Sequence, residues 1–209
     1  MVLVALLFFL PGFRQPMAFV VPMTMLAVLL RKQIASALAV LPPRVAFVGS
    51  GLVFGLATEV FAILGNWDRS DQDKILMHAR PGTDLFFGVF SYGLVMLAWL
   101  PLVERLHFSL REVFVITAAY GIYAEQGGQI LALAVLSPWL GIPLAAIVGA
   151  VYATFPTLAY LVSGRGFSPG RPPTRLRHDV LACLVLFLQW ALFGLVVLPW
   201  LRSLPGIGP

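Results

Sequence analysis

The segment YGIYAEQGGQI, residues 120–130, carries the densest group of chemically capable side chains inside an otherwise apolar run. They comprise an acid, two amides and a phenol: Glu125, Gln126, Gln129 and Tyr123. In a helix, Gln129 would lie one turn beyond Glu125 on the same face, with Gly121 and Gly128 beside it. A carboxyl group that burial keeps protonated can serve as a general acid. The glycines would leave room for a ligand or for another backbone.

A second acid, Glu59, lies inside another apolar run. In a helix it shares a face with Asn66 and follows Gly51 and Gly55, a G-x-x-x-G spacing typical of closely packed membrane helices. A carboxylate at the centre of a bilayer costs about 2.5–3.5 kcal/mol on insertion scales, so an intramembrane acid is a functional candidate by default.

We predict that the helices carrying Glu59 and Glu125 pack together. Two carboxyl groups so close in a low dielectric cannot both ionise, so one of them would keep its proton. The candidate catalytic residues are therefore Glu125 and Glu59, and the candidate ligand-binding residues are Gln126, Gln129, Tyr123 and Asn66. The structural alternative is that such groups only join helices, at about 0.6 kcal/mol per hydrogen bond. We expect that role for Gln189, Thr154 and Thr157.

A charged segment, residues 66–84, holds the other concentration of polar chemistry. Its candidate ligand-binding residues are Asp68, Asp71 and His78. The D-x-x-D spacing of the two aspartates is compatible with magnesium and a diphosphate, but the segment lacks the glycine and glutamate of an EF-hand. One histidine without a second histidine or cysteine makes no zinc site. We therefore expect a solvated lid with internal ion pairs and no metal.

The composition requires a lipid environment. Hydrophobic residues make up 60% of the 209 residues and charged residues 11%, whereas soluble domains have roughly 45–50% and about 25%. So few charges cannot cover a water-soluble fold this apolar. A soluble enzyme, a nucleic-acid-binding module and a disordered chain are excluded, and the single cysteine, Cys183, excludes a disulfide scaffold.

We expect one all-α domain over residues 1–209, a polytopic membrane bundle with about six transmembrane helices, because the apolar runs approach the 20 or so residues that a span needs. The predicted spans are 16–30, 45–65, 85–103, 113–136, 142–162 and 180–201. Residues 1–13 are expected to be a broken or interfacial extension of the first helix. The runs lack the alternation of a membrane β-barrel.

The basic residues predict the orientation. Nine of the fourteen lie in one alternating set of loops, and the positive-inside rule makes that set cytoplasmic. Both termini then face outward, and the predicted outer helix ends carry Trp67, Trp139 and Trp200, as expected of interfacial aromatics. We expect a prokaryotic inner membrane.

Several catalytic and cofactor motifs are absent from the sequence. It has no H-E-x-x-H, G-x-S-x-G, P-loop or C-x-x-C-H, so no cofactor is implied. The net charge of +5 comes from bases flanking the spans, so the expected partners are membrane lipids and other membrane subunits or further copies of the chain, not nucleic acid.

Three functions fit these features. The first is a non-catalytic structural or accessory subunit of a membrane assembly, which we place ahead because no motif argues for chemistry. The second is an intramembrane enzyme acting on an isoprenoid or lipid, with Glu125 or Glu59 as general acid. The third is a small transporter or proton pathway, which normally needs polar groups through the whole depth of the membrane or repeated broken helices.

Overall fold

The computed structural model describes residues 16–67, 70, 76–126, 128–164, 167, 176–205 and 207. Residues 16–19, 125, 126 and 176 are described by their backbone only. The described residues form helices and their connections, with no strand, so the prediction of an all-α fold is confirmed. The prediction for residues 1–13 lies outside the described residues.

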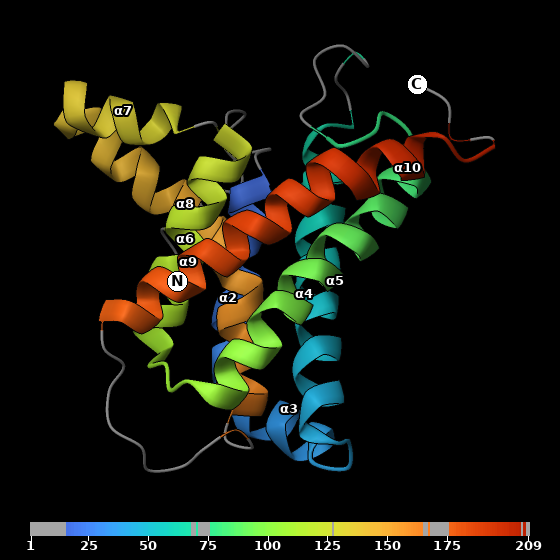
Figure 1. Ribbon diagram of the computed structural model, residues 1–209, viewed down its shortest axis with the longest axis vertical. Helices are drawn as coiled ribbons and strands as arrows, with labels where there is room; N and C mark the ends of the chain where they lie inside the picture. The colour runs from blue at the N-terminus through green and yellow to red at the C-terminus, as the bar shows by residue number, and fades with distance from the viewer. Residues whose placement is uncertain are drawn as a thin grey trace.

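The helices are drawn in Figure 1. Their bounds are α2 Pro16–Leu29, α3 Arg31–Leu38, α4 Pro43–Gly65, α5 Pro81–Arg105, α6 Leu110–Gln126, α7 Gln129–Leu136, α8 Pro138–Ser163, α9 Leu176–Leu192, the π-helical turn η3 Phe193–Val197, and α10 Leu198–Arg202. The last three follow one another without a break and form one long rod.

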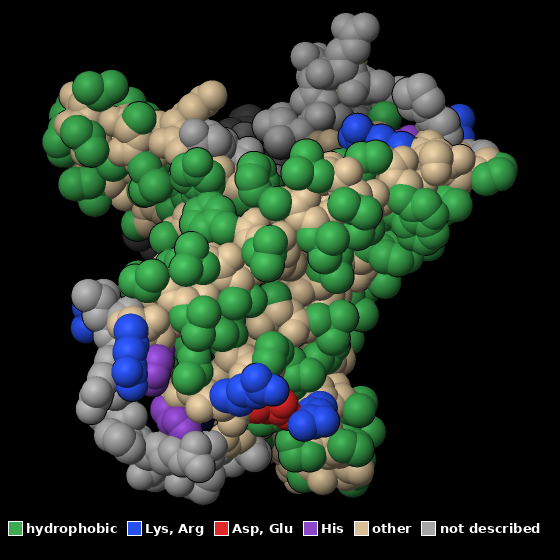
Figure 2. Space-filling view, in the orientation of Figure 1, with side chains coloured by type: hydrophobic (Ala, Val, Ile, Leu, Met, Phe, Trp, Pro, Cys, Tyr) green, Lys and Arg blue, Asp and Glu red, His purple; other side chains and the backbone are tan. Residues whose placement is uncertain are grey.

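Four of these helical segments are long and apolar enough to cross a membrane. They are α4, α5, α8 and the rod from Arg177 to Arg202. The consecutive helices α2 and α3 make a fifth if they are taken as one span, although their axes are bent by 72°. Apolar side chains cover much of the visible face in Figure 2, as expected of a surface that lies in lipid.

The predicted continuous span 113–136 is wrong. Its helix ends at Gln126, and a new helix, α7, begins at Gln129. Between them Gly128 has a φ of 75°, a left-handed conformation that only glycine adopts readily and that ends a helix. With eight residues, α7 rises about 12 Å, too little to cross a bilayer. The first predicted span, 16–30, matches α2, after which the chain turns into the short helix α3.

Local sequence signals explain where the helices begin. A proline stands in the first turn of α4, α5 and α8, where its missing N–H costs nothing. At the start of α6, Ser109 and Glu112 form a capping box: the Ser109 N–H donates to Glu112 Oε2 (2.5 Å), and the Glu112 N–H donates to Ser109 Oγ (3.2 Å).

Helix α8 is the centre of the bundle. It packs against α4, α6 and α7 and also contacts α2 and α3. Helix α5 packs on α4 and on α9, and α9 also packs on α6. The predicted direct packing of 45–65 against 113–136 is not what these helices do, since α4 packs mainly on α8 and α5, and α6 packs mainly on α8. Successive long helices run in opposite directions in Figure 1: α4 ends and α5 begins at the upper end, and α6 and α9 begin lower in the view than they end.

Aromatic side chains fill the core between these helices. Trp99 of α5 is fully buried and meets Phe108 edge to face, with ring centroids 5.4 Å apart. Phe47 of α4 packs on Phe167 in the same way at 5.5 Å. These contacts lie in one apolar cluster that also includes residues of α6, α8 and α9.

Glycines allow the closest helix approaches. A Cβ at Gly121 of α6 would lie 2.2 Å from the Cβ of Tyr152 on α8, and one at Gly149 of α8 would lie 3.1 Å from the Cβ of Ala118 on α6. The two helices therefore interlock, each receiving a side chain of the other where it has none itself. The α7–α8 turn is tighter still, since a Cβ at Gly141 would meet the backbone of Ala134 at 2.2 Å.

The variant Gly121→Ala should destabilise the bundle. The added methyl group meets the Cβ of Tyr152, which cannot swing away as the end of a long side chain can, so we expect a loss of about 1–3 kcal/mol in the free energy of unfolding. Thermal unfolding in detergent, followed by helicity, measures this loss. Gly49→Ala is the matched control, because no atom lies within 4 Å of its added Cβ. Equal melting temperatures for the two variants would contradict the interlocking.

Candidate functional site

The candidate acid Glu59 is paired with a tyrosine of the neighbouring helix. Glu59 lies on α4 with 7% of its surface exposed, and the hydroxyl of Tyr92 on α5 donates a hydrogen bond to its Oε2. Both helices that carry this carboxyl–phenol pair are long and apolar enough to span a membrane.

Small residues on both helices make the pair possible. Gly55 lies one turn before Glu59, and a Cβ there would lie 2.6 Å from Tyr92 Cγ, so the tyrosine ring occupies the space that a side chain would fill. On α5, a Cβ at Gly88 would lie 3.6 Å from Glu59 Cγ. Phe155 of α8 closes the far side with its ring 4.9 Å from that of Tyr92. The predicted close packing at Gly51 and Gly55 is therefore confirmed, with α5 as the partner.

This geometry suits hydrogen bonding better than proton delivery. A general acid must reach the substrate atom at about 2.6–3.2 Å or through one water. Glu59 is instead in contact with Tyr92 and packed over Gly88, so the space beside it is filled by the chain's own side chains.

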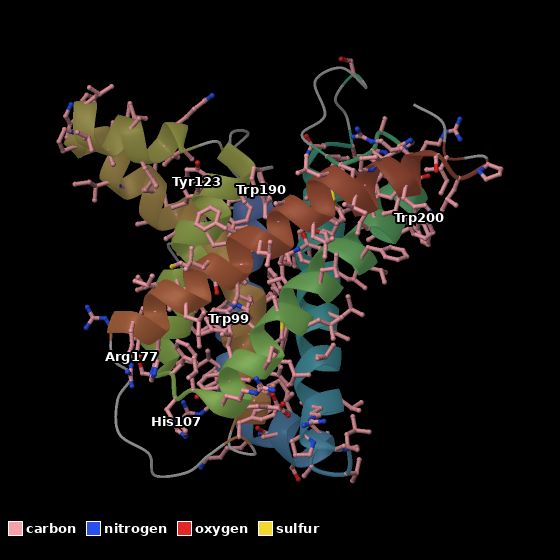
Figure 3. All side chains as sticks on the ribbon, in the orientation of Figure 1. Trp99, His107, Tyr123, Arg177, Trp190 and Trp200 are labelled. Atoms are coloured by element: carbon pink, nitrogen blue, oxygen red, sulfur yellow. The ribbon has the colours of Figure 1, made fainter. Side chains whose placement is uncertain are left out.

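A second polar pair joins α6 to α9. The hydroxyl of Tyr120 donates to Oε1 of Gln189 at 2.8 Å, and Gln189 is buried. One turn along α6, Tyr123 is half exposed and lies edge to face against Phe187 of α9 at 4.9 Å (Figure 3). Gln189 thus joins helices, as expected of it, while Thr154 bonds to the Ala150 carbonyl of its own helix (2.6 Å).

The break between α6 and α7 separates Glu125 from Gly128 and Gln129, which the sequence predicts to lie on the same helical face. Glu125 is the last residue but one of α6, not the middle of a span. Gly128 and Gln129 follow the break, so they do not continue the helical register of Glu125, and Gln129 is exposed at the start of α7. The side chains of Glu125 and Gln126 lie outside the described residues, which leaves their contacts and roles as predictions.

At the upper end, an acid that the sequence places in the charged loop is buried. Asp84 lies in the first turns of α5 with no exposed surface, and its Oδ1 accepts the backbone N–H of His78 at 2.9 Å. The expectation of a solvated position for this end of the segment is wrong for Asp84, because the helix begins at Pro81 and turns it inward. His78 Nδ1 accepts the Arg80 N–H at 2.9 Å, and its ring lies 5.9 Å from that of Phe87.

The remaining candidates at this end are Asn66, Asp68 and Asp71. Asn66 is buried and caps α4, with its Nδ2 donating to the Ala62 carbonyl at 2.8 Å. Asp68 and Asp71 lie outside the described residues. Within the described part of the chain, no three His, Cys, Asp or Glu side chains lie together as metal ligands.

A small apolar pocket opens beside this segment. It has a volume of about 180 Å³ and is lined by Ile63, Trp67, Leu76, Ala79 and Pro81. Pockets that bind drug-sized ligands usually enclose roughly 300–1,000 Å³ and offer a few polar groups. This hollow is smaller and its lining residues are apolar, so it suits the end of an acyl chain better than a polar substrate.

Two residues with buried polar contacts, Tyr92 and Asp84, were not among the candidates predicted from the sequence. Tyr92 lies four residues after Gly88 and four before Met96, which itself occupies the space beside Gly51. The sequence does show large residues at 92 and 96 and glycines at 51 and 55, with the same four-residue spacing. That these two pairs face each other is known only once α4 and α5 are seen to pack together. Asp84 was assigned to the loop because no local signal other than Pro81 marks the start of α5.

The chain matches no protein family, no curated protein and no solved structure.

The variant Tyr92→Phe should weaken the bundle through the loss of one hydrogen bond. It removes the hydroxyl that donates to Glu59 and keeps the ring against Phe155, so we expect the free energy of unfolding to fall by about 0.6–1.7 kcal/mol. Unfolding by titration with a denaturing detergent measures this change. Tyr123→Phe makes the same substitution on a half-exposed side chain and should change stability by less than half as much. A similar loss in both variants would argue against the bond.

The variant Asp84→Ala should release residues 76–80 from α5. Without the carboxylate, the partly buried N–H of His78 loses its acceptor, which costs about 1–3 kcal/mol for a bond of this kind. Hydrogen exchange of the His78 amide should become at least about tenfold faster, while amides in the middle of α5 keep their protection. Thr83→Ala, a neighbouring substitution in the same turn, serves as control. Unchanged exchange at His78 would show that Asp84 does not anchor the segment.

Proposed function

We propose that this chain is a polytopic membrane protein with a non-catalytic role, as a structural or accessory subunit of a membrane assembly. The observation that carries the proposal is the use of its buried polar side chains. Glu59 and Tyr92 join α4 to α5, and Tyr120 and Gln189 join α6 to α9. These polar groups, which in an enzyme would contact a substrate, form hydrogen bonds with neighbouring helices.

The hairpin of α7 and the start of α8 supports the assembly role. It projects from the bundle at the upper left of Figure 1, and apolar residues make up nearly all of it. Its turn exposes Val135, Leu136 and Trp139, the last at 80% of its surface. The hairpin is too short to cross the bilayer, and α7 packs on the chain mainly through α8, with a smaller contact to α6.

We propose six crossings, made by α2, α4, α5, α6, α8 and the α9–α10 rod. The opposite directions of successive helices support this count, and α6, at about 25 Å, nearly matches the hydrocarbon thickness. The lower end of Figure 1 would be cytoplasmic because the bases concentrate there, and both termini would then face outward, in a prokaryotic inner membrane. The exposed Trp67, Trp139 and Trp200 would mark the outer interface.

The enzyme acting on an isoprenoid or lipid stays as the second candidate, since a buried acid beside a phenol is one way to hold a proton for transfer. Glu59 and Tyr92 would then be the acid and its relay, and the apolar pocket beginning one turn above at Ile63 would receive the end of the substrate. The two candidates differ in what accompanies the chain in its membrane.

Native mass spectrometry of the chain, extracted gently from its own membrane, separates these functions. The structural role predicts a stoichiometric complex with other membrane subunits. A lone chain or homo-oligomer that carries a polyprenyl or lipid substrate would overturn it in favour of the enzyme.

The variants Glu59→Gln and Glu125→Gln provide a second test. Glutamine can still accept the bond that a structural glutamate accepts, so both variants should assemble as the parent does. An acid that supplies a proton cannot be replaced in this way. Loss of a lipid-modifying activity in a folded, assembled variant would therefore favour the enzyme.

A further inference from the structure

Exposed basic side chains gather at one end of the bundle. Toward the lower end of Figure 1, the exposed bases of the described residues are Arg31, Lys32, Arg44, Arg105, Arg111 and Arg177. At the upper end they are Arg80 and Arg202. Figure 2 shows blue and purple side chains together in the lower part of this face, and Figure 3 locates Arg177 and His107 among them.

Two of the three described acids at this end are engaged, and the third, Asp179, stands two residues after Arg177 on α9 with its Oδ1 buried and without a hydrogen-bond partner among the described residues. Glu104 is ion-paired with Arg44 at 2.5 Å, and Glu112 accepts the backbone N–H of Ser109 in the capping box that begins α6. Within the described residues, no ion pair is assigned to the other five bases of this end. Their charge is therefore directed outward, toward whatever lies around the end of the bundle.

Helix α3 lies across this end as an interfacial helix does. It turns by 72° from α2, and none of its residues is buried. Arg31 and Lys32 are exposed, whereas Ile34 and Leu38 share one face at a four-residue spacing and are half buried. A short helix that carries exposed bases in its first turn and half-buried apolar residues after them is suited to the boundary between headgroups and acyl chains.

Exposed apolar side chains stand next to the bases. Val40 has 84% of its surface exposed, Val45 adjoins Arg44, and Leu110 adjoins Arg111. An acidic soluble protein would leave such side chains against water or against its own charges. A bilayer leaflet offers phosphates to the bases and acyl chains to the apolar groups at the same depth.

We propose that this end of the bundle, which we call the basic collar, binds the headgroups of anionic phospholipids. The collar consists of Arg31, Lys32, Arg105, Arg111 and Arg177. The proposal rests on the chain spanning a membrane as proposed above. Guanidinium groups suit the phosphodiester oxygens because they donate two parallel hydrogen bonds, and the ammonium of Lys32 adds a point charge. Each base near a lipid surface is worth about 1 kcal/mol, or about fivefold in affinity.

The test is native mass spectrometry of the purified, delipidated chain in detergent, titrated with phosphatidylglycerol or with phosphatidylcholine of the same acyl chains. The parent chain should retain phosphatidylglycerol at least about tenfold better, and the difference should shrink as ionic strength rises. The double variant Arg105→Gln, Arg111→Gln should weaken phosphatidylglycerol binding by about tenfold or more and leave phosphatidylcholine binding unchanged.

The matched control is Arg80→Gln, Arg202→Gln, which removes the same charge from the opposite end and should leave phosphatidylglycerol binding as in the parent. If a collar variant fails to fold, the proposal is still tested by the parent chain, whose preference for phosphatidylglycerol should shrink as ionic strength rises. Equal retention of the two lipids by the parent, or equal loss in both double variants, would overturn the proposal and leave the bases as a topological signal only. Because the chain is purified, this outcome is independent of whether other subunits accompany it in the membrane.

Discussion

The close approach of helices at glycines is the constraint on which the rest of this structure depends. In lipid, no hydrophobic force pushes apolar helices together, so packing and hydrogen bonds between helices must hold the bundle. Gly121 and Gly149 let α6 and α8 interlock, and Gly51 and Gly55 let α5 lie against α4. Since α8 also contacts α2, α3, α4 and α7, it is the element that most of the other helices in the N-terminal three quarters of the chain share, while α5 is attached through α4 and α9.

The polar contacts follow from this packing. Tyr92 reaches Glu59 only because its ring occupies the space above Gly55, so the hydrogen bond depends on the seam that brings the helices together. Such a bond is stronger where water is excluded, and an unmade one is correspondingly costly. Burying the Glu59 carboxyl group without a partner would destabilise the bundle. Its bond to Tyr92 removes that cost and favours the helix faces of α4 and α5 that meet.

The two ends of the bundle differ in the way a membrane protein requires. One end holds the basic collar, the capping box of α6 and the crosswise helix α3, all suited to a charged headgroup layer. The other end holds a buried aspartate that anchors the loop between α4 and α5, and an apolar hairpin that projects beyond the bundle. Charged contacts with lipid and apolar contacts with other subunits would therefore be separated by the thickness of the bilayer.

The sequence by itself determined the helical class, the lipid environment and most helix bounds, because apolar runs of this length have one stable state in a bilayer. It also indicated Gly51 and Gly55 as a packing surface, since small residues at that spacing have a local meaning. Only the tertiary structure decided that Tyr92 is the partner of Glu59, that α4 and α6 both pack on α8 instead of on each other, and that Asp84 is buried. Those facts depend on which faces meet across the bundle, and the break at Gly128 depends on a backbone conformation that two adjacent glycines permit but do not dictate.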